Sequence, residues 1–427
     1  MTPEVKKRIE QIRQGIVPEG YKKTESGIIP NEWRVGQVSK CIEEYKFFSN
    51  DISHIPVYSS SRKGLVPQSD YYNQREAVET NLGYKVVPQG YVTYRHMSDD
   101  DVFHFNINKT GENVLVSSEY PVFTSSDNCD LSFLISVLNN TARFRYFCKM
   151  QKLGGTRTRL YLDNLKRYAL ALPPFDEQKK IAEILSTQDK TIELQARKIE
   201  ELKRFKKGCL EKMFPRKGQK VPEKRFPGFT DDWEQRKAID IADYSKGNGY
   251  SKGDLTDAGT PIILYGRLYT KYQFAISEVD TFAVPRNGAV YSQGNEVIVP
   301  ASGETAEDIA RASAVEKSGV LLGGDLNILR PFDFITPLFL ALAISNGEPQ
   351  KELAKKAQGK SVVHIHNTDI QEVTIAYPSR TEQDRIVSVF RQLDNLITLH
   401  QRKLEEMKRQ KKALMQLLLT GIVRVRL

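Results

Sequence analysis

Apolar residues recur at alternating intervals of four and three positions in two long stretches of the chain, residues 177–214 and 382–419. Such intervals form a heptad repeat, which places the apolar side chains in one narrow stripe along a helix and requires a second helix to cover it. A helix of about forty residues is roughly 60 Å long. We therefore expect two long helices that pair with each other. The predicted seam consists of Ile181, Leu185, Ile192, Ile199 and Leu202 in the first helix and Ile386, Phe390, Leu393, Ile397, Leu404 and Met407 in the second.

The two stretches are copies of one sequence. "EQKKIAEILSTQDK" in the first corresponds to "EQDRIVSVFRQLDN" in the second, at a constant offset of 205 residues. Polar residues interrupt both seams at equivalent positions, Gln195 with His400 and Lys206 with Lys411. Because polar seam residues usually fix the register of a coiled coil, we interpret His400 as a register-setting residue rather than as a catalytic one.

A shorter echo of the same unit opens the chain. "KRIEQIRQGIV" at residues 7–17 matches "ALMQLLLTGIV" at residues 413–423, with Gly15 in the place of Gly421. The chain therefore reads in a circular order of tail, variable region, helix, variable region and helix, which is typical of a duplicated architecture. We predict a pseudo-twofold molecule whose N-terminal segment packs near one end of a long helix.

A variable region of short strands and helices precedes each long helix. Strand-like runs such as "YKVVPQGYVTY" and "EVIVPAS" alternate with Gly, Asn and Asp turns, and the middles of the two regions do not resemble each other by eye. Trp33 and Trp233 open the regions, and we expect both to be structural anchors. The predicted fold class is α+β, with two mixed α/β domains joined by two long antiparallel coiled-coil helices. The predicted segments are an N-terminal stub (1–23), a first domain (24–172), a central helix (173–214), a linker (215–229), a second domain (230–377) and a C-terminal helix with its tail (378–427).

The charge of the chain indicates that it binds a polyanionic partner. The chain has a formal net charge of +10 and a pI near 9.1, and Lys and Arg bind phosphates with release of condensed counterions. No apolar run of about eighteen residues could span a bilayer, and the charged N-terminus lacks the features of a secretory signal. The four cysteines are scattered without a CxxC pair. We expect a cytoplasmic protein with a polyanionic partner.

Candidate DNA-binding residues are basic side chains that occur among hydroxyls, aromatics and glycine turns in the variable regions. Arg and Lys donate to guanine O6 and N7 or to phosphates, and basic residues interleaved with aromatics suit nucleic acid, although a plain surface role stays open for each of them. The candidates of the first region are Ser61, Arg62, Lys63, Tyr94, Arg95, His96, Lys152, Thr156, Arg157 and Arg159. Those of the second region are Tyr250, Ser251, Lys252, Arg267, Lys271, Ser302, Glu304, Thr305, Lys360, Ser361 and His364.

Segments that resemble catalytic or cofactor-binding motifs each lack a required residue. "LPPF" at residues 172–175 has Leu where an amino-methyltransferase needs a polar residue, and "AQGKS" lacks the first glycine of a phosphate loop. His364 and His366 share a strand face without an evident third metal ligand. We expect no catalytic residue, no metal site and no cofactor in this chain.

The chain resembles the specificity subunit of type I restriction-modification systems over nearly its whole length. The residues that carry the resemblance are "LPPFDEQKKIAEILSTQDKTIELQARKIEELKRFKKGCLEKMF", "VPEKRFPGFTDDWE" and "GIIPNEW". The resemblance implies two target recognition domains that read a bipartite sequence in double-stranded DNA, held apart by a helical ruler. It also implies partners: two modification subunits that flip and methylate adenine, and motor-nuclease subunits that cleave. S-adenosylmethionine, ATP and magnesium would then belong to those subunits.

Two other classes of function stay open. A cytoplasmic coiled-coil scaffold that binds proteins would explain the long helices but not the duplicated basic regions, and weak, salt-insensitive DNA binding would favour it. A stand-alone methyltransferase or nuclease would need a cofactor or metal site that the sequence does not provide.

Overall fold

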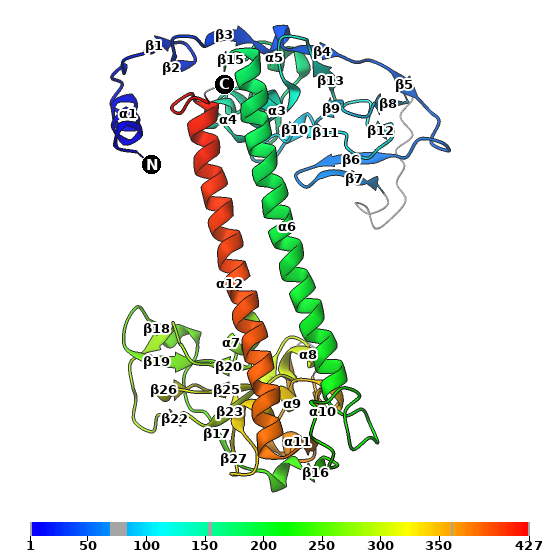
Figure 1. Cartoon of the computed structure of the whole chain (residues 1–427), viewed down its shortest axis with the longest axis vertical. Helices are drawn as coiled ribbons and strands as arrows, with labels where there is room; N and C mark the ends of the chain where they lie inside the picture. Colours follow the sequence, from blue (N-terminus) through cyan, green and yellow to red (C-terminus); the bar gives the residue numbers. More distant parts are fainter. Residues whose placement is uncertain (1, 69–82, 153–155, 360–361, 426–427) are drawn as a thin grey trace. The chain divides into compact units, whose positions relative to one another are not determined.

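The computed structural model describes residues 2–68, 83–152, 156–359 and 362–425 (Figure 1). The chain divides into two compact units, here called unit 1 (residues 1–194 and 404–427) and unit 2 (residues 195–403). The two long helices are α6 (Phe175–Met213) and α12 (Arg380–Leu419). Each of them contributes one segment to each unit.

Unit 1 combines short antiparallel strands with helices. A four-stranded sheet has the order β11-β9-β13-β4, and a three-stranded sheet has the order β12-β8-β5. The pairs β1-β2, β3-β15, β6-β7 and β10-β14 complete the strands. The strands are β1 (Tyr21–Thr24), β2 (Gly27–Pro30), β3 (Arg34–Gln37), β4 (Ile42–Glu44), β5 (Phe48–Ser49), β6 (Tyr58–Ser61), β7 (Gly64–Pro67), β8 (Tyr84–Val87), β9 (Val92–Thr93), β10 (Met97–Ser98), β11 (Asn106–Ile107), β12 (Val114–Val116), β13 (Val122–Ser125), β14 (Thr158–Arg159) and β15 (Ala169–Leu172). The helices are α1 (Pro3–Arg13), α3 (Leu131–Asn140), α4 (Ala142–Lys149) and α5 (Leu162–Lys166).

Unit 2 is built on two five-stranded sheets, with the orders β17-β27-β23-β25-β20 and β18-β21-β19-β26-β22. Two separate two-stranded sheets, β16-β29 and β24-β28, complete the strands of this unit. The strands are β16 (Glu234–Lys237), β17 (Ala242–Lys246), β18 (Leu255–Thr256), β19 (Thr260–Ile263), β20 (Ala275–Ile276), β21 (Phe282–Ala283), β22 (Tyr291–Gln293), β23 (Glu296–Pro300), β24 (Ser302–Gly303), β25 (Ser313–Val315), β26 (Ser318–Leu322), β27 (Leu326–Pro331), β28 (Val363–His364) and β29 (Thr374–Tyr377). The helices are α7 (Arg267–Thr270), α8 (Ala306–Ile309), α9 (Pro337–Ile344), α10 (Gly347–Lys356) and α11 (Asn367–Gln371).

Within each unit the segments of α6 and α12 run antiparallel, as the heptad pattern predicts. In unit 2, Gln195 donates from Nε2 to Nδ1 and to the carbonyl oxygen of His400, at 2.8 and 2.9 Å. Lys206 of the same unit lies 2.5 Å from the carboxylate of Asp394. In unit 1, Lys411 pairs with Asp189 in the equivalent way. All eleven predicted seam residues are buried or half-buried. The predicted fold class is confirmed.

A buried glutamate at the start of each long helix ties that helix to its unit. The carboxylates of Glu177 and Glu382 are both 1% exposed. Arg424 donates twice to Glu177, at 2.7 and 2.8 Å, and Arg225 donates twice to Glu382, at 2.8 Å. Planar guanidinium groups suit this bidentate geometry, so each buried negative charge is compensated. Glu177 also accepts a hydrogen bond from the indole of Trp33.

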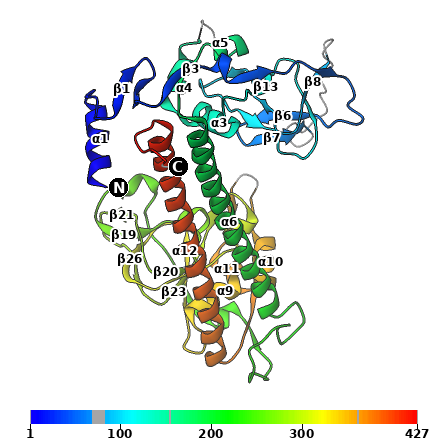
Figure 2. The same cartoon turned by 45° about the horizontal axis from the view of Figure 1, so that its top comes forward.

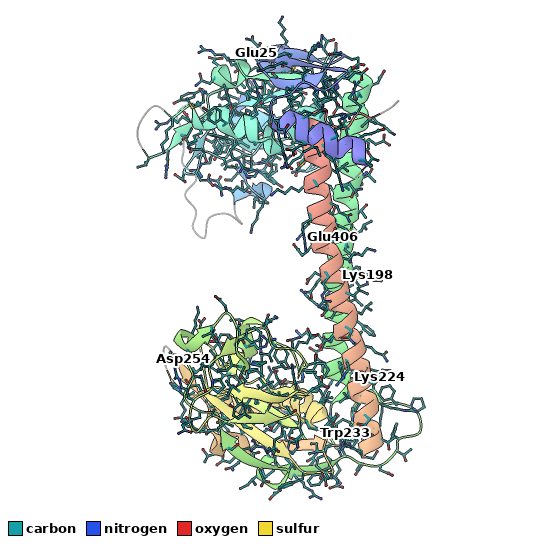
Figure 3. The ribbon with its side chains drawn as sticks, turned by 90° about the vertical axis from the view of Figure 1, so that its left-hand side faces the viewer. Glu25, Lys198, Lys224, Trp233, Asp254 and Glu406 are labelled. Atoms are coloured by element: carbon teal, nitrogen blue, oxygen red, sulfur yellow. The ribbon has the colours of Figure 1, made fainter. Side chains whose placement is uncertain are left out.

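Both tryptophans lie in the hydrophobic cores. Trp33 is in the core of unit 1 with the start of α6 and the end of α12, and Trp233 is in the core of unit 2. Trp233 packs edge-on against Phe214 and Phe339, with ring centroids 5.9 and 5.7 Å away. Figure 3 shows Trp233 beside the long helices of unit 2. The anchor role predicted for these residues agrees with their burial.

The N-terminal segment contacts the end of α12 inside unit 1, and Figure 2 shows α1 near that end. Arg8 of α1 donates to the carbonyl oxygen of Ile422 at 2.7 Å, and the hydroxyl of Tyr21 donates to that of Gly421 at 2.8 Å. Gly15 and Gly421, which the sequence echo aligns, adopt the same left-handed backbone with φ values of 76° and 71°. Glycine adopts this conformation without the steric penalty of a side chain.

The variable regions share a backbone plan that the sequence did not reveal. In unit 1, β10 pairs with β14 through Met97 and Arg159, and in unit 2, β24 pairs with β28 through Ser302 and His364. Ser302 follows Met97, and His364 follows Arg159, by the same repeat offset of 205 residues. The expectation that the middles differ therefore holds for the side chains but not for this pairing, because strand pairing uses backbone groups that every residue carries.

Candidate nucleic-acid interface

A tight turn in unit 1 projects Arg62 and Lys63 from the β6-β7 hairpin. The hydroxyl of Ser61 donates to the carbonyl oxygen of Gly64 at 2.9 Å and accepts from the amide of Lys63 at 3.0 Å. Gly64 has a φ of 113°, which favours glycine. Ser61 is therefore used by the turn, while Arg62 and Lys63 are exposed at its tip.

Three consecutive aspartates, Asp99, Asp100 and Asp101, form a segment that we call the acidic turn. Asp99 accepts from Nε of Arg157 at 2.8 Å, and Asp100 accepts from Nη2 of Arg62 at 2.5 Å. Asp101 accepts from the hydroxyl of Thr158 and has a left-handed φ of 62°. This conformation is uncommon for residues other than glycine, although aspartate adopts it more readily than most.

The pKa of Asp100 lies below its usual value. Desolvation acts to raise this pKa, but the hydrogen bonds from Ser98 and Arg62 lower it by a larger sum. Asp100 is therefore ionised at neutral pH and holds Arg62 through a charge-assisted hydrogen bond.

A cavity of about 390 Å³ lies beside the acidic turn. Its lining includes Arg62, Lys63 and Arg95 of the predicted residues, together with Asp99 and His104. The structure thus gathers three predicted cations from two separate segments. The guanidinium groups of Arg95 and Arg159 and the ammonium of Lys63 form no ion pair with any residue that the structure describes.

Two predicted residues of unit 1 are buried instead. Tyr94 is 0% exposed and donates to the carbonyl oxygen of Leu160 at 3.0 Å. His96 is also buried, stacks on Tyr161 with ring centroids 5.5 Å apart, and lies 3.8 Å from the carboxylate of Glu119. Burial lowers the pKa of His96. These positions argue against direct contact of either side chain with DNA.

Lys152, Thr156, Arg157 and Arg159 are exposed around the gap at residues 153–155, which lies outside the described residues. Arg159 is in β14, next to Met97 of β10. The acidic turn and these residues therefore belong to the same part of unit 1.

A larger cavity, of about 1030 Å³, brings together five predicted residues of unit 2. These residues come from the segment before β18 and from α7 with the residue that follows it, which lie apart in the sequence. They are Tyr250, Ser251, Lys252, Arg267 and Lys271. Figure 3 shows Asp254, another lining residue, on the side of unit 2 away from the long helices.

Arg267 has little exposed surface in this cavity. Its side chain is 9% exposed, and it donates to Asp280 at 2.5 Å, to Gln273 at 3.2 Å and to the carbonyl oxygen of Glu278 at 3.0 Å. Lys271 also donates to Asp280, at 2.5 Å. The hydrogen bonds from Lys271 and then Arg267 strongly lower the pKa of Asp280. Arg267 therefore holds the loop, and Lys271 is the more accessible cation of the pair.

Arg286 is a candidate that the sequence reading missed. Its side chain is 56% exposed, pairs with Asp254 and lies over the ring of Tyr250 at 5.2 Å. The amide of Arg286 donates to the hydroxyl of Tyr250 at 2.8 Å, and Tyr250 itself is buried. Tyr250 thus supports the cation rather than the ligand surface. The "VPRNG" sequence around Arg286 is a turn signal that could have identified it.

The remaining predicted residues of unit 2 occupy the β24-β28 pair and α8. Ser302 is buried and its hydroxyl lies 3.0 Å from Nδ1 of His364. Thr305 caps α8, and Glu304 next to it is exposed. Lys360 and Ser361 lie outside the described residues.

The described residues include no group of three or more His, Cys, Asp or Glu side chains that could hold a metal ion. Within the same part of the chain, each helix is too short or too polar to cross a membrane.

Known proteins resemble this chain over most of its length. The family model described as the type I restriction modification DNA specificity domain matches twice, at residues 35–204 and 230–409. Each match covers one variable region and most of the following long helix.

Two relatives from Methanocaldococcus jannaschii are similar to this chain in sequence. The MjaVIII type I restriction enzyme specificity subunit is 25% identical over 62% of this chain and 63% of its own length. The putative MjaX specificity subunit is 23% identical over 96% of this chain and 97% of its own length.

Two solved structures share the fold. One, from work on complex assembly and conformational transition of the type I R-M system, is 14% identical with a TM-score of 0.55 and covers 92% of this chain and 99% of its own. The other, the type I restriction-modification system S subunit from M. genitalium, is 13% identical with a TM-score of 0.53 and covers 90% of this chain and 96% of its own. With two family matches that together span most of its residues, this chain belongs to the type I restriction-modification DNA specificity family.

Proposed function

We propose that this chain is the subunit that reads a DNA target in two separated parts and directs partner subunits to it. The observation that carries the proposal is the double match to the DNA specificity domain, at residues 35–204 and 230–409. One domain in each half of the chain gives two readers, and each reader would contact its own half of the target.

Cations in both units support DNA as the ligand. In unit 1, Arg62, Lys63 and Arg95 line one cavity. In unit 2, Lys252 and Lys271 line another. Contacts to phosphates supply affinity without sequence information, whereas contacts to base edges supply specificity. Each unit therefore needs both kinds of contact.

The long helices would set the number of unread base pairs between the two half-sites. An antiparallel pair of equivalent helices presents its two ends in inverted orientation, so the half-sites would lie on opposite strands. The polar pair Gln195 and His400 supports this role, since such a pair fixes the register of the helices.

The chemistry would belong to the partners. We expect two modification subunits that flip and methylate an adenine, and restriction subunits with motor and nuclease activity. S-adenosylmethionine, ATP and magnesium would bind to those subunits, and this chain would be non-catalytic. We expect the complex to act in the cytoplasm. The relatives are described as specificity subunits, which supports this division of labour.

The alternative of a protein-binding coiled-coil scaffold is not favoured. It accounts for α6 and α12 but not for two DNA specificity domains. It also gives no reason for exposed cations in both units.

The proposal is tested by sequencing methylated bases in cells that express this chain with its modification subunit. Cells that lack this chain are the control. A methyl-adenine motif with two specified parts and a constant unread gap is expected. An undivided motif, or no new methylation by a complex that co-purifies intact, would contradict the two-reader model.

A further inference from the structure

Two arginines of unit 1 are held by neighbouring carboxylates of the acidic turn. Arg62 comes from the β6-β7 turn and pairs with Asp100, whereas Arg157 precedes β14 and pairs with Asp99. We propose that Arg62 and Arg157 read guanine in the half-site of unit 1, and that Asp100 and Asp99 are their positioning residues. This inference rests on the proposed function and adds the base that unit 1 selects.

The acidic turn is itself rigidly held. Asp100 accepts from the hydroxyl of Ser98 at 2.9 Å in addition to Arg62, and the amide of Val102 donates to Ser98 at 3.1 Å. Asp101 bonds to Thr158, one residue after Arg157. These contacts join the acidic turn to β14, so both arginines are attached to one fixed segment.

Donor groups of both arginines remain available to a ligand. A guanidinium has five N–H groups in a planar fork, and the side chains of Arg62 and Arg157 are 62% and 51% exposed. Asp99 engages Nε of Arg157, which leaves both terminal nitrogens of that residue. Asp100 engages Nη2 of Arg62, which leaves Nη1. A fork fixed on one side and open on the other suits two acceptors in one plane.

The carboxylates favour a base over a phosphate. A guanidinium paired with a carboxylate carries little net charge, so it releases few counterions and gains little from a phosphate, which the carboxylate repels. Its N–H groups keep their direction and can donate to neutral acceptors. Guanine presents two acceptors, O6 and N7, on its major-groove edge, whereas adenine presents a donor beside N7. A positioned arginine therefore selects guanine.

Two cations near the paired arginines differ from them in having no carboxylate partner among the described residues. Lys63 and Arg95 line the same cavity, and neither forms an ion pair with a described residue. Unpaired cations keep their full charge and are suited to phosphates. Unit 1 thus separates the two tasks: paired arginines for bases, and unpaired cations for the DNA backbone.

Methylation sequencing tests the inference in the complete complex. The variants are Asp99→Asn, Asp100→Asn and Lys63→Ala, each expressed with the modification subunit. We expect the wild-type motif to contain guanine in one half-site, on either strand. Each aspartate variant should relax that position about tenfold or more, without changing the other half-site or the gap. Lys63→Ala should weaken methylation of all sites and reduce the salt dependence of binding, with the motif unchanged.

A second measurement separates positioning from folding. The purified complex is bound to duplexes in which 7-deazaguanine replaces each guanine of the target in turn, because this analogue lacks the N7 acceptor. The wild-type complex should lose roughly tenfold in affinity or more at one or two positions. The aspartate variants should show little further loss at those positions, while their second half-site stays intact.

The outcomes distinguish this inference from the proposed function. A divided motif with no guanine·cytosine pair in the half-site that the variants affect would overturn the inference and leave the proposed function standing. So would aspartate variants that weaken all sites uniformly, as Lys63→Ala does. No divided motif for the wild type would remove the proposed function, and the inference with it.

Discussion

Gln195 and His400 occupy the same position in the two copies of the repeat and bond to each other, with Nε2 of Gln195 2.8 Å from Nδ1 of His400. In an antiparallel pair of equivalent helices, two equivalent residues lie opposite each other only at the pseudo-twofold axis that relates the helices. The two lysine–aspartate pairs, Lys206 with Asp394 and Lys411 with Asp189, are themselves counterparts at the repeat offset. The polar pair therefore marks the centre of the register.

Replacing this pair should stabilise the helices and loosen their register. For Gln195→Leu combined with His400→Leu, we expect the free energy of unfolding in urea to rise by on the order of 1 kcal/mol, because polar seam residues reduce stability. We also expect the methylated motif to lose its single gap length. Gln188 is half-buried and corresponds to the seam residue Leu393 at the offset of 205 residues. Gln188→Leu is therefore the matched control, since it adds an apolar seam residue and keeps the pair. An unchanged gap in the double variant would show that other contacts set the register.

The two buried glutamates predict unit-specific instability. Arg424→Ala leaves the carboxylate of Glu177 buried without its guanidinium, and Arg225→Ala does the same to Glu382. Each substitution should lower stability by about 3 kcal/mol. Hydrogen exchange should increase in unit 1 for the first variant and in unit 2 for the second. Adding Glu177→Gln to Arg424→Ala should recover part of the loss, because it removes the buried charge. Equal exchange in both units would contradict the assignment.

The burial of Arg267 and the exposure of Arg286 predict opposite effects. Arg267→Ala removes hydrogen bonds to Asp280, Gln273 and Glu278 and should lower the free energy of unfolding by about 2 kcal/mol. Arg286→Ala should change stability by less than about 1 kcal/mol but alter the half-site read by unit 2. Thermal unfolding and methylation sequencing of both variants measure these effects. A selective motif change in a stable Arg267→Ala would instead support the prediction from the sequence that Arg267 contacts DNA.

The buried His96 predicts a loss of stability in mild acid. Its folded pKa is lowered by burial, with Glu119 opposing and Arg159, Arg95 and Lys85 adding to the effect. As the pH falls below about 6.5, the usual pKa of histidine, His96 therefore binds a proton in the unfolded chain before it does so in the folded chain. Stability should be full above that pH and decrease below it. Hydrogen exchange of unit 1 between pH 7.5 and 5.5 measures this slope. His96→Gln should reduce this slope.

Periodicity made the long helices predictable. The heptad residues needed only their own spacing to indicate a seam, and the offset of 205 residues indicated the partner. The acidic turn gave no such signal, because Asp100 meets Arg62 38 residues away and Asp99 meets Arg157 58 residues away. The pair of Asp99 and Arg157 forms only after strand pairing brings β10 to β14, and the pair of Asp100 and Arg62 needs the β6-β7 turn to reach the acidic turn.

Local composition misjudged which aromatic residues are accessible. Tyr94 and Tyr250 stand beside basic residues in the sequence, which suggested a shared surface. Both are buried, and each uses its hydroxyl for a backbone hydrogen bond. Both lie in the segments between strands, where side chains that are adjacent in the sequence point in different directions, so a residue next to an exposed cation can belong to the core.

The division of the chain into units has a consequence for synthesis on the ribosome. Unit 2 is continuous, from residue 195 to residue 403, whereas unit 1 needs residues 404–427 in addition to the first 194. Its core includes Leu418 and Leu419, and its buried Glu177 awaits Arg424. Domains generally fold as units while the chain grows. The domain that is begun first is therefore completed last, and its apolar surface stays uncovered while the second domain is made.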